Sequence, residues 1–291
     1  MAIWNLGSIN ADHFYALPHL PAPGETLAAN GFRVGLGGKG ANQSVAAARA
    51  GADVQHIGAV GRDGVWALDR LGEYGVGTGG VIVGETPTGH AIINVAADGE
   101  NAIVIFPGAN AALDADTVGK TIEAAAAGDL LLMQNETTLQ PEAAALSAKL
   151  GMRLIYSAAP FEISAVEAVL DHVDVLIVNE VEAAQLCDAM GTAIDAVPVP
   201  NLLVTKGADG AEWYVKGAAT IRVPSPSVDP VDTTGAGDTF AGFIAAGLDA
   251  GLDIAPAMAR AAAAAALKVT RPGTADAIPT LAEVQAFMAA R

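Results

Sequence analysis

Cysteine, basic side chains and long apolar runs are the scarce features of this sequence. Cys187 is the only cysteine among 291 residues, so no intrachain disulfide can form. Lysine and arginine number 15 against 32 aspartates and glutamates, a formal charge of -17, which argues against nucleic acid and anionic membranes as partners. No apolar run approaches the roughly eighteen residues of a membrane helix, and the N-terminus lacks the basic and apolar pattern of a secretion signal. We therefore expect a soluble, cytoplasmic protein.

Apolar residues, in contrast, make up 52% of the chain and charged residues only 16%, which predicts a sizeable core. Short apolar runs alternate with longer alanine-rich stretches, a pattern typical of a mostly parallel sheet with helices on both faces. The predicted strands are 2–8, 54–60, 129–134, 153–157, 174–178 and 201–206. The predicted helices are 40–50, 64–74, 116–127, 140–150, 162–170, 180–190, 237–250, 255–269 and 280–290. The length allows one large domain or two of ordinary size, and we expect one α/β domain over residues 1–291, a three-layer α/β/α sandwich.

Two segments interrupt this alternation, at about 13–35 and 81–106. They contain strand-like runs separated by turns, including a turn at Asp98-Gly99, and few helix signals. We expect them to form a small β-sheet inserted into the larger domain as a lid.

The most informative motif lies near the C-terminus, where residues 232–240 read DTTGAGDTF. A turn of small residues that opens a helix leaves several N–H groups unpaired, and the helix dipole adds positive charge there. Asp238 places a carboxylate at this anion hole, where a base could take a hydroxyl proton beside a bound phosphate. The pattern therefore indicates phosphoryl transfer, although Asp238 as a plain helix cap is the simpler alternative.

Residues 35–40 read GLGGKG and contain a G-x-G-x-x-G match. The context is wrong for a dinucleotide site, because the match does not follow the first buried strand. The glycines precede a helix that has Lys39 and Asn42 in its first turns. Lys39 can only donate hydrogen bonds and Asn42 can donate and accept them, so the pair suits ligand hydroxyls. A glycine-rich turn with an exposed lysine is the alternative. No P-loop sequence is present.

Polar residues also follow several predicted strands. Asn10 and Asp12 come after the first strand and Glu136 after 129–134, at the edge where open α/β sheets bind ligands. Asn179 and Glu182 follow another strand. Carboxylate and amide there suit a water-rich Mg²⁺ shell, and a helix N-cap explains them equally well.

A tight loop at 205–210 follows a further strand and could lie against a nucleotide, or be a bare hairpin turn. Several of these modest signals fall on one edge of one sheet. That convergence is the main argument from the residues for a site there.

These motifs resemble those of the ribokinase-like (PfkB) sugar kinases, in the right order from about residue 3 to 290. The matching stretches are GSINAD at 7–12, GGKGAN at 37–42, the N-x-x-E pair at 179 and 182, and DTTGAGD at 232–238. Further matches at PGET (23–26), GANAA (108–112) and Met133-Gln134-x-Glu136 place it nearest the ribose-phosphorylating branch. The resemblance implies transfer of the γ-phosphoryl group of ATP to the primary hydroxyl of D-ribose, giving ribose 5-phosphate.

The resemblance also implies roles for individual residues. Asp238 is the expected base, and the N–H groups of Gly235, Ala236 and Gly237 are expected to stabilise the transferred group. The sugar hydroxyls are assigned to Asn10, Asp12, Gly38, Lys39, Asn42, Glu136 and Asp238. The nucleotide is assigned to Asn179, Thr205, Gly207, Gly210 and Gly237, and Mg²⁺, through water, to Glu182. The lid sheet is expected to pair two subunits into a homodimer.

A K⁺ activator is implied as well, held by Asp232, Thr234, Lys268, Arg271 and Gly273. Ala277 departs from the family pattern, which offers a serine hydroxyl to the cation. Ala261 stands where His or Asn often lines the adenine pocket, and the stretch from Cys187 to Asn201 is shorter than in many members.

Alternatives remain from the residues alone. The same phosphoryl transfer could act on a ketohexose, a sugar acid or a nucleoside. The base of a nucleoside could pack against Phe14, Tyr15 and Phe32. A sugar-binding regulator without catalysis is disfavoured by the intact 235–238 motif. An NAD-dependent dehydrogenase rests only on the weak glycine match.

Overall fold

The computed structural model describes residues 1–291 and contains two sheets. The strands of the larger sheet are β1 (Ala2–Leu6), β4 (Asp53–Gly61), β5 (Val76–Gly84), β8 (Leu130–Gln134), β9 (Arg153–Ser157), β10 (Val175–Asn179), β11 (Asn201–Thr205), β12 (Ala211–Val215) and β13 (Ile221–Val223). Their spatial order is β13-β12-β11-β10-β9-β8-β1-β4-β5. The strands from β11 to β5 run parallel, and β12 and β13 add an antiparallel edge.

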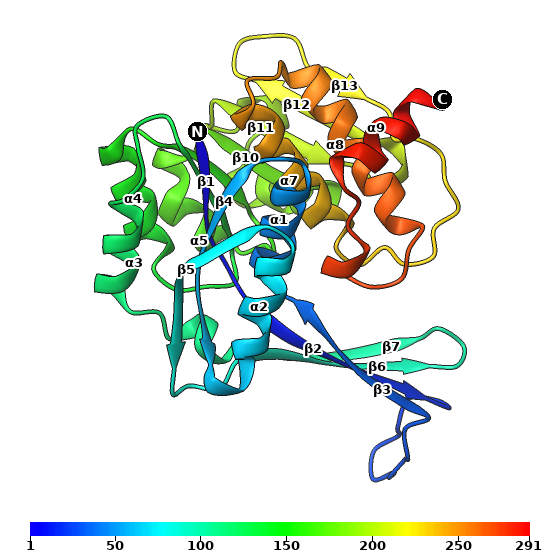
Figure 1. Cartoon of the computed structure of the whole chain (residues 1–291). Helices are drawn as coiled ribbons and strands as arrows, with labels where there is room; N and C mark the ends of the chain where they lie inside the picture. The colour runs from blue at the N-terminus through cyan, green and yellow to red at the C-terminus, as the bar shows by residue number, and fades with distance from the viewer.

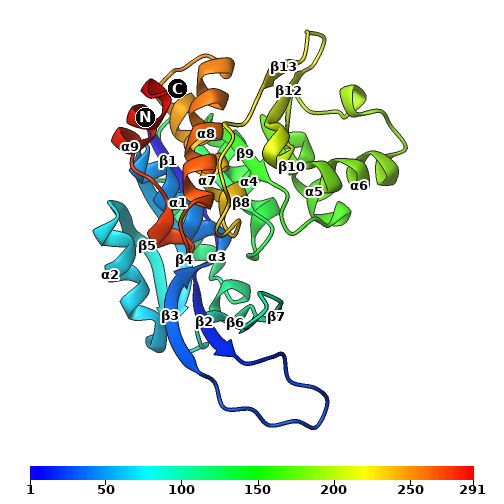
Figure 2. The same ribbon diagram turned by 90° about the vertical axis from the view of Figure 1, so that its right-hand side faces the viewer.

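Helices cover both faces of this sheet, as Figures 1 and 2 show. One face carries α1 (Lys39–Arg49), α2 (Val65–Glu73), α7 (Ala236–Asp249), α8 (Ile254–Val269) and α9 (Leu281–Ala289). The other carries α3 (Ala115–Ile122), α4 (Gln140–Leu150), α5 (Ile163–Val169) and α6 (Glu180–Met190). Short 3₁₀ turns, such as Gly207–Asp209 and Ala275–Ala277, join some of these elements.

The buried strands supply side chains to two separate cores. In β8, Leu130 and Leu132 belong to the core beneath α1, α7 and α8, whereas Leu131 and Met133 belong to the core beneath α3 to α6. Successive side chains of a strand point to opposite faces, so an apolar run serves both layers. The predicted three-layer α/β fold with a mostly parallel sheet is therefore confirmed.

The smaller sheet projects from one end of the molecule (Figure 1). Its strands are β2 (Asn10–Leu17), β3 (Gly31–Gly37), β6 (Gly89–Ala96) and β7 (Asn101–Phe106), in the order β3-β2-β6-β7. Residues 81–84, expected in this sheet, instead pair with 58–61 of β4 and belong to β5 of the larger sheet. We call the four-stranded sheet the lid sheet.

The chain order of the strands creates a switch point between β1 and β8. From β1 the chain builds outwards through β4 and β5 on one side, and from β8 through β9, β10 and β11 on the other. In open α/β sheets, ligands bind beyond the carboxyl ends of the strands at such a point. The lid sheet leaves the body there, because β2 follows β1 directly. None of the helices combines the length and apolar character needed to span a membrane.

Candidate active site

The turn before α7 presents free main-chain donors. Gly235 caps the helix at φ 74, a left-handed conformation that glycine adopts without strain. The N–H groups of Gly235, Gly237 and Asp238 have no acceptor in the protein, whereas Ala236 N donates to Thr233 O at 3.2 Å. Three unpaired donors at a helix start form an anion site.

The Asp238 carboxylate lies buried at this turn and is held by two amides of α1. Asn42 Nδ2 donates to its Oδ2 and Gln43 Nε2 to its Oδ1, each at 3.0 Å. Gly242 lets the two helices approach this closely, because a Cβ there would lie 2.5 Å from Ala46 Cβ. The carboxylate is therefore fixed by helix packing, not by a flexible loop.

A chain of buried polar side chains continues from Gln43 beneath the sheet edge. Gln134 Nε2 donates to Gln43 Oε1 at 2.8 Å and to Asn5 Oδ1 at 2.9 Å. Asn5 Nδ2 donates to Ser44 Oγ at 2.8 Å, and Ser44 Oγ lies 2.8 Å from His56 Nδ1. Burial lowers the pKa of His56 to about 4, so the ring is neutral near pH 7. Sequence reasoning missed this network, whose one signal is polar residues inside apolar strand runs.

The first lid strand carries two of the residues expected to bind sugar. Asn10 and Asp12 are both buried, and Asn10 Oδ1 accepts a hydrogen bond from Asn110 Nδ2 at 2.8 Å. Burial, with the nearby Glu136 carboxylate, raises the pKa of Asp12 to about 7. A carboxyl group with that pKa can accept or donate hydrogen bonds near neutral pH.

Lys39 and Glu136 meet at the start of α1. Gly38 has φ 90 and turns the chain so that Lys39 N donates to Glu136 Oε2 at 3.0 Å. Burial lowers the pKa of the Lys39 ammonium, but the carboxylates of Asp238, Glu136 and Glu182 outweigh it and the net shift is upward. Lys39 therefore stays a cation among three carboxylates.

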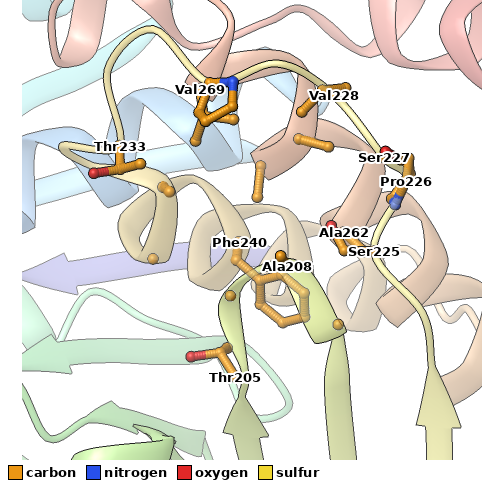
Figure 3. Close-up of a pocket in the computed structure, with 17 residues that line it drawn as sticks. Thr205, Ala208, Ser225, Pro226, Ser227, Val228, Thr233, Phe240, Ala262 and Val269 are labelled. Atoms are coloured by element: carbon orange, nitrogen blue, oxygen red, sulfur yellow. The ribbon is translucent and has the colours of Figure 1, made fainter.

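A cavity of about 400 Å³ lies beside the anion hole (Figure 3). Thr205, Gly207 and Gly210, expected to contact nucleotide, line it together with Ala236 and Gly237 of α7. The remaining lining residues were not expected: Ala208, Ser225, Pro226, Ser227, Val228, Pro230, Thr233, Phe240, Ala262, Ala265, Ala266 and Val269. The cavity thus joins the anion hole to a mostly apolar slot between the 225–230 loop and α8.

Ala261, which the resemblance implies in an adenine pocket, does not line this cavity. Ala261 is fully buried in the core, and α8 presents Ala262, Ala265 and Ala266 to the cavity instead. These three methyl groups and Phe240, not the identity of residue 261, set the width and polarity of this slot.

Asn179 and Glu182 form the N-terminal capping box of α6. Glu182 N donates to Asn179 Oδ1 at 2.9 Å, and Asn179 N donates to Glu182 Oε2 at 2.7 Å. The simpler interpretation of this pair as a helix cap therefore holds in the structure. Glu182 keeps its second carboxylate oxygen free, and burial raises the pKa of its carboxyl group. That oxygen fits a water-mediated contact to Mg²⁺.

The carboxylate expected to hold K⁺ already binds the main chain. Thr234 N donates to Asp232 Oδ1 and Gly273 N to Asp232 Oδ2, each at 2.9 Å. Burial would raise the pKa of Asp232, but these two hydrogen bonds and Lys268 outweigh it and the net shift is downward. Asp232 is thus ionised and joins the 232–235 turn to the 271–273 turn.

Two positions of the expected K⁺ site, Lys268 and Ala277, fit a resident ion poorly, whereas the carbonyls of Thr234, Arg271 and Gly273 accept no hydrogen bond in the protein. The Lys268 carbonyl accepts a hydrogen bond from Arg271 N at 3.0 Å, and Ala277 offers no side-chain oxygen. The Lys268 side chain is fully buried, and its Nζ donates to Asp232 O at 2.9 Å. An ammonium group therefore already contacts the turn that the ion would bind.

Comparison with known proteins agrees with this arrangement. Residues 3–281 match the pfkB family of carbohydrate kinases. A ribokinase of Haemophilus influenzae is 36% identical, over 97% of this chain and 97% of its own. The crystal structure of ribokinase from Thermotoga maritima matches with a TM-score of 0.90 at 31% identity, over 99% of both chains. That of Arabidopsis thaliana ribokinase complexed with ribose and ATP matches with a TM-score of 0.89 at 30% identity, also over 99% of both. This chain is therefore a member of the pfkB family of carbohydrate kinases.

Proposed function

We propose that the chain is an ATP-dependent ribokinase, which transfers the γ-phosphoryl group of ATP to the primary hydroxyl of D-ribose. One observation carries the proposal: the Asp238 carboxylate and the free N–H groups of Gly235 and Gly237 share a single helix start. A base beside an anion hole is what phosphate transfer to an alcohol requires. The likeness to ribokinases over nearly the whole chain supports ribose as the acceptor.

In the proposed reaction, Asp238 takes the proton of the sugar hydroxyl as that oxygen attacks the γ-phosphorus of ATP. Gly235 and Gly237 donate to the phosphoryl oxygens as negative charge spreads over them. Their amides are unpaired in the protein, so no hydrogen bond has to break before they donate to the phosphoryl group. The Lys39 ammonium, at the start of α1, adds positive charge on the sugar side.

The sugar side offers matched hydrogen-bonding groups. Asn10, Asp12 and Glu136 lie at the switch point, and the buried Asn42 Oδ1 has no partner in the protein. A buried acceptor without a donor is costly, and a ribose hydroxyl would satisfy it. We infer that these groups, with the main chain at Gly38, bind the ribose hydroxyls.

The nucleotide is placed in the 400 Å³ cavity, with its phosphates towards Gly237 and its base in the slot beside Phe240. Mg²⁺ would neutralise the β- and γ-phosphates, and the free oxygen of Glu182 would hold one of its waters. We leave K⁺ out of the proposed reaction because the residues around Lys268 fit it poorly. We also propose a cytoplasmic location, because ATP is available there.

We also propose that the lid sheet closes over the sugar and pairs two subunits. Asp12 and its cross-strand neighbours Gly35 and Ala91 lie on the face that carries the expected sugar ligand. The opposite face carries four exposed apolar side chains: Phe32, Val34, Val104 and Phe106. We call this the outer lid face. An apolar sheet surface of this kind is typical of a subunit interface.

The aromatic residues of the lid sheet disfavour a nucleoside as the acceptor. On the outer lid face, the centroid of the Phe32 ring lies 4.9 Å from that of Tyr15 and 5.8 Å from that of His13. On the face of Asp12, the Arg33 guanidinium lies 3.5 Å from the centroid of the Phe14 ring and covers it, so Phe14 does not offer an open slot for a base beside the expected sugar ligands.

The test is ADP release from MgATP with D-ribose, a ketohexose, a sugar acid and a nucleoside. We expect strong turnover on D-ribose, lowered by roughly 10²–10⁴ in Asp238→Asn. Turnover on another acceptor alone would overturn ribose as the substrate while keeping the chemistry. No turnover with any acceptor would overturn the proposed function.

A further inference from the structure

Lys268 is a fully buried lysine that the proposed reaction does not use. It lies in the last turn of α8, and its Nζ donates to the carbonyl of Asp232 at 2.9 Å. Lysine is almost never fully buried unless its charge is compensated. The compensating groups are that carbonyl and the carboxylates of Asp232 and Asp238, whose charges favour the ammonium, although burial outweighs them and the net shift of the Lys268 pKa is downward.

The packing of two helices puts this charge at the anion hole. Helix α7 begins and α8 ends at the same place, and the segment before α7 is tied to α8 because Val231 N and Asp232 N both donate to Val269 O. The ammonium group therefore contacts the same turn, 232–238, whose free amides face the phosphoryl group. It also lies at the C-terminal end of α8, where the helix dipole favours a cation.

Three groups around Lys268 are less suited to a second cation than the resemblance implies. The Asp232 carboxylate binds two main-chain N–H groups, the Lys268 carbonyl accepts from Arg271 N, and position 277 has no hydroxyl. Two unit charges close together in a buried site repel strongly, since the effective dielectric is far below that of water. The resemblance implies K⁺ at this place, and the residues present disagree with it.

We propose that Lys268 is the built-in cation of the anion hole. Its ammonium supplies to the 232–238 turn the positive charge that K⁺ would supply, and its hydrogen bond to Asp232 O holds the turn in place. The enzyme then needs no monovalent ion. Lys268 touches neither substrate, so it is a positioning residue. The turnover readout rests on the proposed ribokinase function, but the binding of the ion to the protein does not.

The first measurement needs no variant. Turnover of the wild-type enzyme with ribose and MgATP is compared in potassium chloride and in choline chloride at equal ionic strength. We expect the two rates to agree within about twofold, since a fixed charge already stabilises the site. A rise of about tenfold or more with K⁺ would overturn the proposal.

The second measurement removes the ammonium. Lys268→Met keeps an unbranched side chain of similar length, and Lys149→Met is the control at an exposed lysine of α4. In choline chloride we expect kcat to fall about tenfold in Lys268→Met, with the KM for ribose unchanged, because the lost charge acts at the phosphoryl group. Equal kcat in the two variants would show that the ammonium supplies nothing to the reaction.

The third measurement reports ion binding without activity. The double variant Lys268→Ala/Ala277→Ser removes the ammonium and most of the side chain at position 268 and places a hydroxyl group at position 277. We expect K⁺, but not choline, to raise the melting temperature of this variant and to leave that of the wild type unchanged. A K⁺-dependent rise in the wild type would overturn the proposal. If ribose gives no turnover in any salt, the proposed function fails, and these melting curves still decide the role of Lys268.

Discussion

Gln43 Nε2 lies 3.0 Å from Asp238 Oδ1 and donates a hydrogen bond to it, while Gln43 Oε1 accepts one from Gln134 Nε2 at 2.8 Å. The Gln43 amide is thus held at both ends, so its orientation is defined. It fixes one oxygen of the carboxylate that we propose as the base and leaves the other to Asn42. The proposed base is therefore held through α1 and β8 without a bound ligand.

We predict that Gln43→Met lowers kcat about 10- to 100-fold, because the carboxylate loses one of two donors that orient it. The KM for ribose should stay within about twofold, since Asn42 and Asp12 remain. Gln43→Glu should be worse than Gln43→Met, because it puts a second carboxylate beside Asp238. Steady-state kinetics measure this, with exposed Gln285→Met as the control. Equal activity of Gln43→Glu and Gln43→Met would contradict an electrostatic role.

Asp238→Asn should keep the fold and lower kcat by roughly 10²–10⁴, the usual contribution of a positioned general base. The amide has the shape of the carboxyl group but cannot take the proton. The KM for ATP should change little, because the cavity residues are untouched. Asp188→Asn, on the exposed side of α6, is the matched control. Near-normal kcat in Asp238→Asn would remove it from the reaction.

The fold was predictable where apolar runs are long and regular. The buried strands β8, β9, β10 and β11 and the helices around them differ from the predicted ranges by one or two residues at most ends. The strand β5 was missed because its sequence, VGTGGVIVG, is rich in glycine and does not alternate. The place of β5 in the larger sheet depends on its pairing with β4, and the sequence of one strand does not show which strand it pairs with.

The candidate site was predictable where residues stand at strand ends or helix starts. Glu136 follows the parallel strand β8, and Asn42 and Asp238 lie in the first turns of α1 and α7, where ligands of open α/β sheets are expected to bind. The Gln43–Gln134–His56 network could not be foreseen, since its members lie on three elements and their contacts depend on helix packing. Similarly, the face of α8 that meets the cavity depends on a rotation of the helix that an all-alanine run does not specify.

Asp12 should make the stability of the free protein depend on pH. Its pKa is about 7 in the folded protein against an ordinary 3.8, mainly because burial disfavours the carboxylate. Between these two values the folded state binds more protons than the unfolded state. The contribution of Asp12 to the free energy of unfolding is therefore fully present below about pH 4 and is lost as pH rises through 7. Its size is about 1.4 kcal/mol per unit of pKa shift. Urea unfolding at several pH values should therefore show a fall in the free energy of unfolding that is smaller in Asp12→Asn. Identical pH dependence in both proteins would contradict the raised pKa.

The outer lid face should pair two subunits. Val34 and Val104 lie in one cross-strand row through His13 and Ile92, and both are exposed. Lysine at both positions would put charge into an apolar interface, so Val34→Lys/Val104→Lys should sediment as a monomer of 29.1 kDa and the wild type at twice that mass. The control is Ile103→Lys/Ile105→Lys, which adds the same charge to exposed positions on the opposite face of β7 and should leave the dimer intact. A wild-type monomer in analytical ultracentrifugation would refute the dimer, and dissociation by the control alone would move the interface to the face of Asp12.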